Sequence, residues 1–314
     1  MNKQYLSKLK NPNMRKLLLD KENIPVLETL LEQANQEYEP IKALKESKKL
    51  DFGKKLSKEE LKETFTQVRN KVDAFLGVSD IEPPKCSYYS LFRPGITTTP
   101  VLLSYIFSSA RYIASISSSM GLIDVPFMNV ESSTSALEAG VTLSLTVIFH
   151  DMFRKDTYIP LFGGLVSLAK NKRCNLIPSA GHEYTHHVQK NHIKREILDN
   201  IKRTFSMFDE GHARGVQEYL ARTYAEKEDN PAFLYDTLDT KVGELKRTYK
   251  WICKKLGVQK RESLLKTKSS RDGSKRISKP SKHALGNTFF SIYEAKRGPQ
   301  IYDNILHGTF QFSR

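Results

Sequence analysis

The sequence changes in character twice along its length, which limits the folds that it can adopt. Residues 1–80 are rich in Lys, Glu and Leu and contain few glycines, whereas residues 85–170 are rich in β-branched, aromatic and hydroxyl side chains. From residue 176 onward, apolar residues return to the spacing of amphipathic helices. A strand-rich segment between two helical ones predicts an α+β fold, with a mixed or antiparallel sheet formed by about residues 98–170.

The first 80 residues predict a helical region of their own. Apolar residues at helical spacing indicate one helix around Leu27–Leu31 and a second over Leu61–Phe75, and Asp51–Gly53 separates the two. The sequence Ser57-Lys-Glu-Glu60 has the pattern of a capping box at the start of the second helix. We expect this N-terminal helical region either to cap the rest of the chain, residues 81–314, or to wrap around it.

Strands are predicted for the middle of the chain. Residues 141–149 alternate apolar and polar positions, as a half-buried strand does. Thr157–Phe162 and, after two glycines, Leu165–Ala169 predict two further strands. Residues 101–119 fit either a buried helix or a strand, and we favour the helix.

Three helices are predicted near the C-terminus. Asn230 and Pro231 can start a helix whose apolar residues recur at steps of three and four until Gly257 ends it. A second helix begins near Ser281, and after the turn at Gly298-Pro299 a short third helix follows.

The formal net charge of +15 is concentrated towards the C-terminus. Residues 251–314 hold 14 basic and 4 acidic side chains, and nine of these basic groups lie in residues 260–282. We therefore expect residues 258–282 to form a solvated basic linker. A basic segment can bind nucleic acid or an acidic protein, but no recognised nucleic-acid motif accompanies this one.

The cysteines and the apolar runs indicate the compartment. Cys86, Cys174 and Cys253 are far apart and form no CxxC pair, so neither a disulfide framework nor a thiolate metal cage is expected. No apolar run has the length of a signal-peptide core or of a membrane span. We expect a cytoplasmic protein without a membrane span.

The histidines gather in one short segment. Five of the eight lie in residues 182–212, and Gly181–His187 contains the pattern HExxH. On a helix, His182 and His186 project from one face a turn apart, so both imidazoles can bind one metal ion. Glu183 lies one step further round, where its carboxylate can take a proton from a metal-bound water. Chance would produce the pattern on the order of 0.01 times in a chain of this composition.

Catalytic zinc takes three protein ligands and a water, and two residues compete for the third place. Glu210 lies 24 residues after His186, which leaves room for a helix end, a turn and an antiparallel return. His192 would complete the spacing HExxHxxxxxH, but that arrangement normally needs a glycine where this chain has Gln189. In a continuous helix, His192 would lie roughly 9 Å along the axis from His186. We therefore favour Glu210.

Two neighbours of Glu210 have open roles. Asp209 could orient an imidazole, but an Asp just before a helix is more often an N-cap, and we favour the cap. His212 could support the ligands or lie exposed, and the sequence does not distinguish these alternatives.

The string HEYTHH followed by EGHARGVQEYL resembles the gluzincin branch of the zinc metallopeptidases, in particular a group of predicted zinc-dependent proteases with an HEYxH helix and a following E-G-x-A helix. The likeness covers about residues 140–306. It implies a zincin-like metallopeptidase domain in residues 81–314. In that domain, active-site and glutamate helices would occupy residues 176–226, and residues 230–314 would form a helical C-terminal part.

The resemblance also implies roles for individual residues, namely zinc ligands His182, His186 and Glu210, and a general base, Glu183. Leu165–Ala169 is similar to the edge strand that holds the substrate backbone by strand addition. His283 stands where such families often have a Tyr or His that donates a hydrogen bond to the oxyanion.

The sequence thus predicts a peptidase that uses Zn²⁺ to hydrolyse peptide bonds in a peptide or protein substrate. The alternative is a basic binding or regulatory protein, for nucleic acid or an acidic protein, in which the metal site is structural or vestigial.

Overall fold

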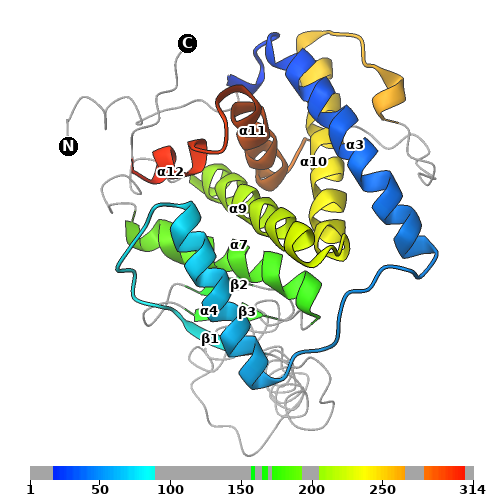
Figure 1. The fold of residues 1–314 in the computed structure, drawn as a ribbon. Helices are drawn as coiled ribbons and strands as arrows, with labels where there is room; N and C mark the ends of the chain where they lie inside the picture. Colours follow the sequence, from blue (N-terminus) through cyan, green and yellow to red (C-terminus); the bar gives the residue numbers. More distant parts are fainter. Residues whose placement is uncertain are drawn as a thin grey trace, which may run out of the picture. The chain divides into compact units, whose positions relative to one another are not determined.

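The computed structural model of the chain describes residues 17–88, 157–159, 165–168, 172–192, 205–265 and 279–307 (Figure 1). The chain divides into two compact units. The first consists of Met1–Cys86, Tyr158–Val166 and Lys170–Arg314, and the second of Ser87–Thr157 and Ser167–Ala169. All of the described helices belong to the first unit.

Helices make up most of the described part of the chain. They are α3 (Asn23–Glu46), α4 (Lys58–Phe75), α7 (Arg173–His192), α9 (Phe205–Glu228), α10 (Ala232–Leu256), α11 (Lys282–Arg297) and α12 (Ile301–Leu306), with a 3₁₀ turn at Glu262–Leu264. The described strands are β1 (Lys85–Tyr88), β2 (Thr157–Ile159) and β3 (Leu165–Leu168), in the order β1-β3-β2.

The predicted α+β fold is wrong, because the described residues are mostly helical. The strands are only three or four residues long, too short to form the sheet layer on which the active-site helix was expected to pack. The core lies between helices instead, since the long helices bury their apolar faces against one another. The expected strand at 141–149 and the ambiguous segment 101–119 lie outside the described residues.

The expected edge strand at Leu165–Ala169 also needs correction. Its described part, β3, lies between β1 and β2, so both of its sides are already paired. A strand that is paired on both sides has no free backbone groups for an added peptide. Strand addition at this segment is therefore not supported.

Several predicted helix ends are confirmed. In the capping box, Ser57 Oγ accepts a hydrogen bond from the Glu60 N–H at 3.2 Å, and Glu60 Oε2 accepts one from the Ser57 N–H at 2.7 Å. Gly257 ends α10 with a φ of +65°, a left-handed conformation that glycine adopts without strain. At the start of α11, Ser281 Oγ accepts a hydrogen bond from the Ala284 N–H at 3.1 Å.

The helix α9 is central to the arrangement of the first unit. It packs against α7 and α11, and Figure 1 shows it lying between them. The N-terminal helices pack on helices from later in the chain, α3 along α10 and α4 along α7. Side chains of α7, α9 and α11 can therefore meet at one place.

Candidate metal centre

The structure brings together three side chains that the sequence had indicated as ligands, His182 and His186 of α7 and Glu210 of α9. The two histidine Nε2 atoms lie 3.2 Å apart. They lie 3.3 and 3.8 Å, respectively, from the two oxygens of Glu210. Among the residues that the structure describes, this is the one group of three or more His, Cys, Asp or Glu side chains whose ligand atoms all lie within 4.8 Å of one another.

These separations fit a single metal ion. Ligand atoms that bind a tetrahedral zinc ion at about 2.0–2.1 Å lie about 3.3 Å from one another. The two histidine nitrogens of the group are 3.2 Å apart, that of His182 lies 3.3 Å from Oε2 of Glu210, and that of His186 lies 3.8 Å from Oε1. Two imidazoles and one carboxylate also leave a fourth position open, which is the donor set of a catalytic zinc site rather than a structural one.

The helix α7 holds its two histidines firmly because most of its residues are buried. Tyr184 and Val188, which flank the histidines, have no exposed surface and belong to the core. A Cβ at Gly181 would lie 2.0 Å from Leu220 Cδ1 of α9, so a side chain there would require Leu220 to shift. The helix α7 therefore packs closely on α9 beside His182.

The helices α9 and α11 cross with their backbones in contact. A Cβ at Gly211 would lie 2.4 Å from the Gly286 carbonyl oxygen, and a Cβ at Gly286 would lie 1.9 Å from the Met207 carbonyl oxygen. Glu210 directly precedes the first of these glycines, and His283 lies one turn before the second. The glycine crossing therefore sets the distance between Glu210 and His283.

The charge states of the three side chains suit metal binding. Burial lowers the pKa of His182 to about 3, although a hydrogen bond with Glu210 opposes this shift. Burial also lowers the pKa of His186. At Glu210, burial favours the neutral acid, but hydrogen bonds from His182 and His283 hold the pKa of this carboxyl well below its usual range. Neutral imidazoles and an ionised carboxylate are the forms that bind a metal ion.

The two residues predicted to be catalytic lie beside the group. Glu183 is buried on α7 and directly follows His182. His283 of α11 places its Nδ1 3.0 Å from Oε2 of Glu210, and 49% of its side chain is exposed. The hydrogen bond with Glu210 raises the pKa of His283, although burial opposes this shift. His283 therefore lies at the solvent side of the group, and its protonated, donating form is favoured.

Two other residues considered from the sequence lie elsewhere or act differently. His192, at the end of α7, places its Nε2 3.3 Å from Nδ1 of His307 and does not belong to the ligand group. Asp209 is not an N-cap, because α9 already begins at Phe205, so that prediction is wrong. Burial and the neighbouring charge of Glu210 raise the pKa of Asp209 to about 8.

Two buried polar residues lie behind the ligands: Gln189, which the sequence did not indicate as functional, and His212, whose role the sequence left open. Gln189 is 2% exposed and His212 is fully buried. Oε1 of Gln189 lies 2.9 Å from Nδ1 of His186, and its Nε2 lies 3.1 Å from Nδ1 of His212. Gln189 follows His186 by three residues, a spacing at which helical side chains touch and which could have identified it. No spacing marks His212, because its contact with Gln189 joins two helices.

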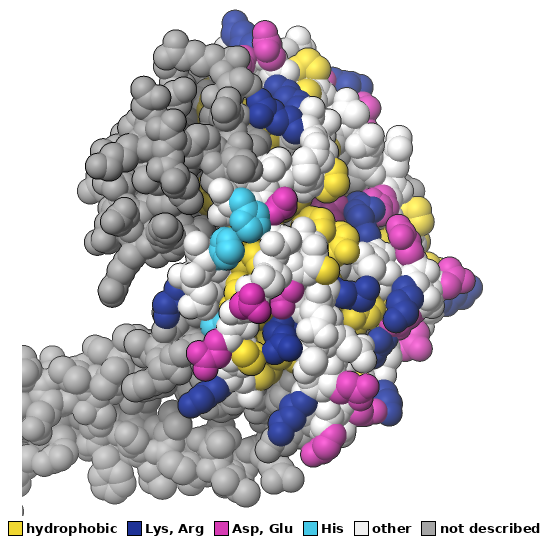
Figure 2. Space-filling model, turned by 60° about the vertical axis from the view of Figure 1, so that its left-hand side comes forward, with side chains coloured by type: hydrophobic (Ala, Val, Ile, Leu, Met, Phe, Trp, Pro, Cys, Tyr) yellow, Lys and Arg dark blue, Asp and Glu magenta, His cyan; other side chains and the backbone are white. Residues whose placement is uncertain are grey.

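The described surface bears charges of both signs. In Figure 2, basic and acidic side chains are interspersed over the part of this face that the structure describes. Most of the predicted basic linker lies outside the described residues. At its described start, Arg261 pairs with Glu28 and Glu32 of α3 at 3.4 and 2.8 Å. Within the described ranges, no helix combines the length and apolar character that a membrane span requires.

The two histidines and the carboxylate carry the chemistry of the site. No protein-family model, curated protein or solved structure matches the chain.

Proposed function

We propose that the chain is a zinc-dependent peptidase of the gluzincin type, with His182, His186 and Glu210 as zinc ligands. The observation that most supports this is the convergence of the HExxH helix and a glutamate from a second helix at distances that suit one tetrahedral ion. Glu183 occupies the place of the general base in this motif. A structural zinc usually has four protein ligands, so a group of three among the described residues favours catalysis.

The reaction assigns one task to each side chain of the site. When bound, Zn²⁺ polarises the scissile carbonyl and lowers the pKa of a water molecule. Glu183 takes the proton of the attacking water and passes it to the leaving amine, so the peptide C–N bond breaks after the new C–O bond has formed. His283, which is favoured in its protonated form, donates a hydrogen bond to the oxyanion.

The proposed substrate is a peptide or protein in the cytoplasm. Cys86, Cys174 and Cys253 are all free thiols. Free cysteines suit a reducing compartment, where disulfides are rare. Peptide libraries of mixed sequence are therefore the appropriate first substrates.

Two substitutions separate metal binding from catalysis. We expect Glu183→Gln to keep zinc and to lower the rate of peptide hydrolysis by at least about 100-fold, because the general base is lost. We expect Glu210→Ala to lose zinc, because only two protein ligands would be left. Metal analysis of the purified proteins and cleavage of a peptide library are the measurements, with Glu226→Gln, an exposed change on the same helix as Glu210, as the control.

A Glu183→Gln variant that cleaved peptides at the wild-type rate would refute the mechanism. A Glu210→Ala variant that kept its zinc would remove Glu210 from the ligand set. Gently purified wild-type protein that lacked zinc and bound nucleic acid in a salt-dependent way would support the alternative of a basic binding protein.

A further inference from the structure

A relay of hydrogen bonds, which runs through Gln189 and His212, leads from the ligand His186 to the backbone of α12. Nδ1 of His186 lies 2.9 Å from Oε1 of Gln189, and Nε2 of Gln189 lies 3.1 Å from Nδ1 of His212. Nε2 of His212 lies 3.0 Å from the carbonyl oxygen of Tyr302. A second bond joins Nε2 of Gln189 to the carbonyl oxygen of Asp209 at 3.0 Å.

Two backbone carbonyls fix which atom donates in every hydrogen bond of this relay. A carbonyl oxygen can only accept, so Nε2 of His212 must carry the hydrogen that it donates to Tyr302. In a neutral imidazole, Nδ1 of His212 is then an acceptor, and it receives a hydrogen from the amide nitrogen of Gln189. The Asp209 carbonyl assigns the same orientation to this amide independently, because it too requires a nitrogen donor.

The orientation of Gln189 determines the state of the metal ligand. Because His212 and Asp209 accept from the amide nitrogen of Gln189, its amide oxygen faces His186, so Nδ1 of His186 must carry a hydrogen. Nε2 of His186 is then left with a free lone pair directed at His182 and Glu210. We propose that Gln189 and His212 are positioning residues that lock His186 in the tautomer and ring orientation needed for metal binding.

Burial strengthens the hydrogen bonds that orient His186. Gln189 is 2% exposed and His212 is fully buried, so water does not compete for their hydrogen bonds. The other imidazole ligand lacks such support, since Nδ1 of His182 is buried without a hydrogen-bond partner among the described residues. Partners behind a metal ligand orient it and raise its basicity. The relay therefore makes His186 the better-held of the two histidine ligands.

The inference rests on the proposed metal centre, but its first test needs no metal. In the metal-free full-length chain labelled with ¹⁵N-histidine, long-range ¹H–¹⁵N spectra distinguish the two neutral tautomers of each ring. We expect His186 to carry its hydrogen on Nδ1 and His212 on Nε2, with both signals assigned by their loss in His186→Phe and His212→Phe. A hydrogen on Nε2 of His186 would overturn the relay.

The second test measures zinc affinity by competition with a chelator. Gln189→Met removes the acceptor for His186 at a similar side-chain volume, and we expect zinc affinity to fall about 10–100-fold. Gln189→Glu should recover most of the loss, because a buried, protonated carboxyl still offers one acceptor and one donor. Lys190→Met, an exposed change at the next position of α7, is the control and should bind zinc like the wild type.

The outcomes separate the relay from the proposed function. A folded Gln189→Met variant with wild-type zinc affinity would refute the relay. Wild-type protein that binds zinc but cleaves no peptide would refute the peptidase and leave the relay standing. If Gln189→Met fails to fold, the tautomers of the wild-type rings still decide between a locked and an unlocked His186.

Discussion

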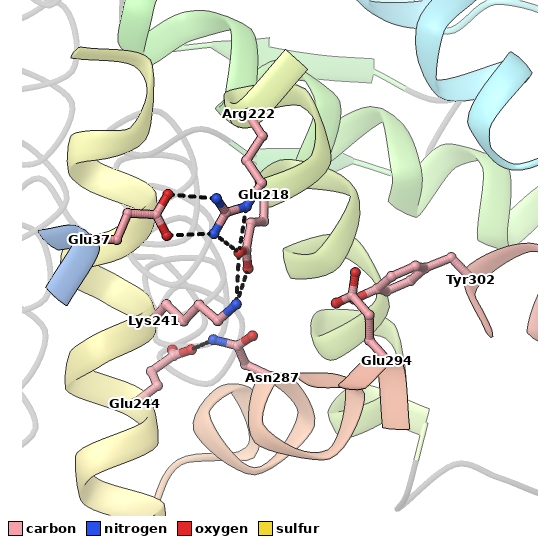
Figure 3. A network of polar contacts seen from close by, with 8 residues as sticks. All are labelled: Glu37, Glu218, Arg222, Lys241, Glu244, Asn287, Glu294 and Tyr302. Atoms are coloured by element: carbon pink, nitrogen blue, oxygen red, sulfur yellow. Dashed lines mark hydrogen bonds and ion pairs between the residues drawn. The ribbon is translucent and has the colours of Figure 1, made fainter. Parts of the chain in front are cut away.

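Tyr302 links the hydrogen bonds behind the metal centre to Glu294, which lies near a network of partly buried charges. Its carbonyl accepts from His212, its ring stacks on Phe290 with centroids 5.6 Å apart, and its hydroxyl donates to Oε2 of Glu294 at 2.9 Å. Figure 3 shows the tyrosine and Glu294 beside the network around Glu218. Single residues of this protein thus connect several helices through polar groups as well as through packing.

The network in Figure 3 is built around one largely buried carboxylate. Glu218 of α9 accepts from Lys241 at 2.6 Å and from Arg222 at 2.8 Å. Arg222 also donates to both oxygens of Glu37, at 2.6 and 2.9 Å, which links α9 to α3. Although burial favours the neutral acid, Lys241 and Arg222 lower the pKa of Glu218. Glu218 is therefore held as a carboxylate.

The pKa of Glu294 is shifted in the opposite direction to that of Glu218. This shift predicts that the stability of the protein depends on pH. Burial and the charge of Glu218 raise the pKa of Glu294 above 4.5, its ordinary value. The folded chain then binds a proton that the unfolded chain releases, so the free energy of unfolding falls as the pH rises from 4.5 towards the raised pKa. Glu294→Gln removes this loss while its amide oxygen can still accept from Tyr302.

We therefore expect the stability of Glu294→Gln relative to the wild type to increase between pH 4.5 and pH 7. Urea unfolding at a series of pH values measures the difference. Glu226→Gln, an exposed change on α9, is the control variant. A difference between Glu294→Gln and wild type that stays constant with pH would contradict the raised pKa.

At His283, an effect on catalysis can be separated from an effect on zinc binding. Its Nδ1 contacts the ligand Glu210 at 3.0 Å, but its half-exposed ring lies outside the three-ligand group. We expect His283→Ala to keep zinc and to lower kcat for peptide cleavage by about 100-fold, with little change in KM, because an oxyanion donor acts mainly in the transition state. Loss of zinc in this variant would instead show that His283 is needed to hold Glu210 in place.

At the scale of helices, the crossing of α9 and α11 depends on two glycines. The Gly286 backbone leaves no space for a methyl group, since the Met207 carbonyl oxygen would lie 1.9 Å from it. We expect Gly286→Ala to destabilise the protein by about 3 kcal/mol or more, because the backbone of one helix would have to move. The same movement would separate His283 from Glu210.

Gly243→Ala in α10 is the matched control for this prediction. Nothing lies within 4 Å of the Cβ that the change would add, and Gly243 lies inside a helix. We expect this change to stabilise the protein by about 0.5–1 kcal/mol, because alanine favours a helix over glycine. Thermal or urea unfolding of both variants compares the two effects. Equal stabilities would show that α9 and α11 do not touch at this crossing.

The helices could be predicted from the sequence because their signals are local. The period of apolar residues, the capping box at Ser57 and the glycine at 257 lie within or directly beside the helix that they define. A strand needs a partner strand outside its own segment, and alternation in a short segment does not identify that partner. The sheet predicted for residues 98–170 is therefore not the basis of the fold in the part of the chain that the structure describes.

The candidate site likewise contains residues that local sequence signals predict and residues that they do not. His182 and His186 could be predicted because their spacing on one helix defines the site. Glu210 was favoured over His192 because the helix was expected to continue through Gln189, and α7 does extend to His192. The pairing of Gln189 with His212 could not be predicted, because it depends on how closely α7 and α9 approach.

At the scale of the first unit, α3 is held by both apolar and polar contacts. Leu27 and Leu31 are completely buried. Tyr38 donates to Asp239 of α10 at 2.5 Å, and Glu28 accepts from Tyr249 of the same helix at 2.5 Å. The helix is thus an integral part of the core.

We therefore expect residues 51–314 expressed alone to melt at a lower temperature than the full chain and to aggregate, because α10 would expose the surface that α3 covers. Co-expression with residues 1–50 should restore a stable complex that copurifies through a tag on either piece. The break lies in the segment between α3 and α4, so it cuts no helix. A fragment of residues 51–314 as stable as the whole chain would show that α3 is dispensable.

The pairing of α3 with α10 has a consequence for biosynthesis. Tyr38 and its partner Asp239 are 201 residues apart in the chain. At the usual pace of translation, α3 leaves the ribosome about 10–40 s before its partner has been made. During this interval its apolar face, with Leu27 and Leu31, has no native partner and is a natural target for chaperones. The metal centre is completed later still, because Tyr302, whose carbonyl ends the relay, follows Asp239 in the sequence.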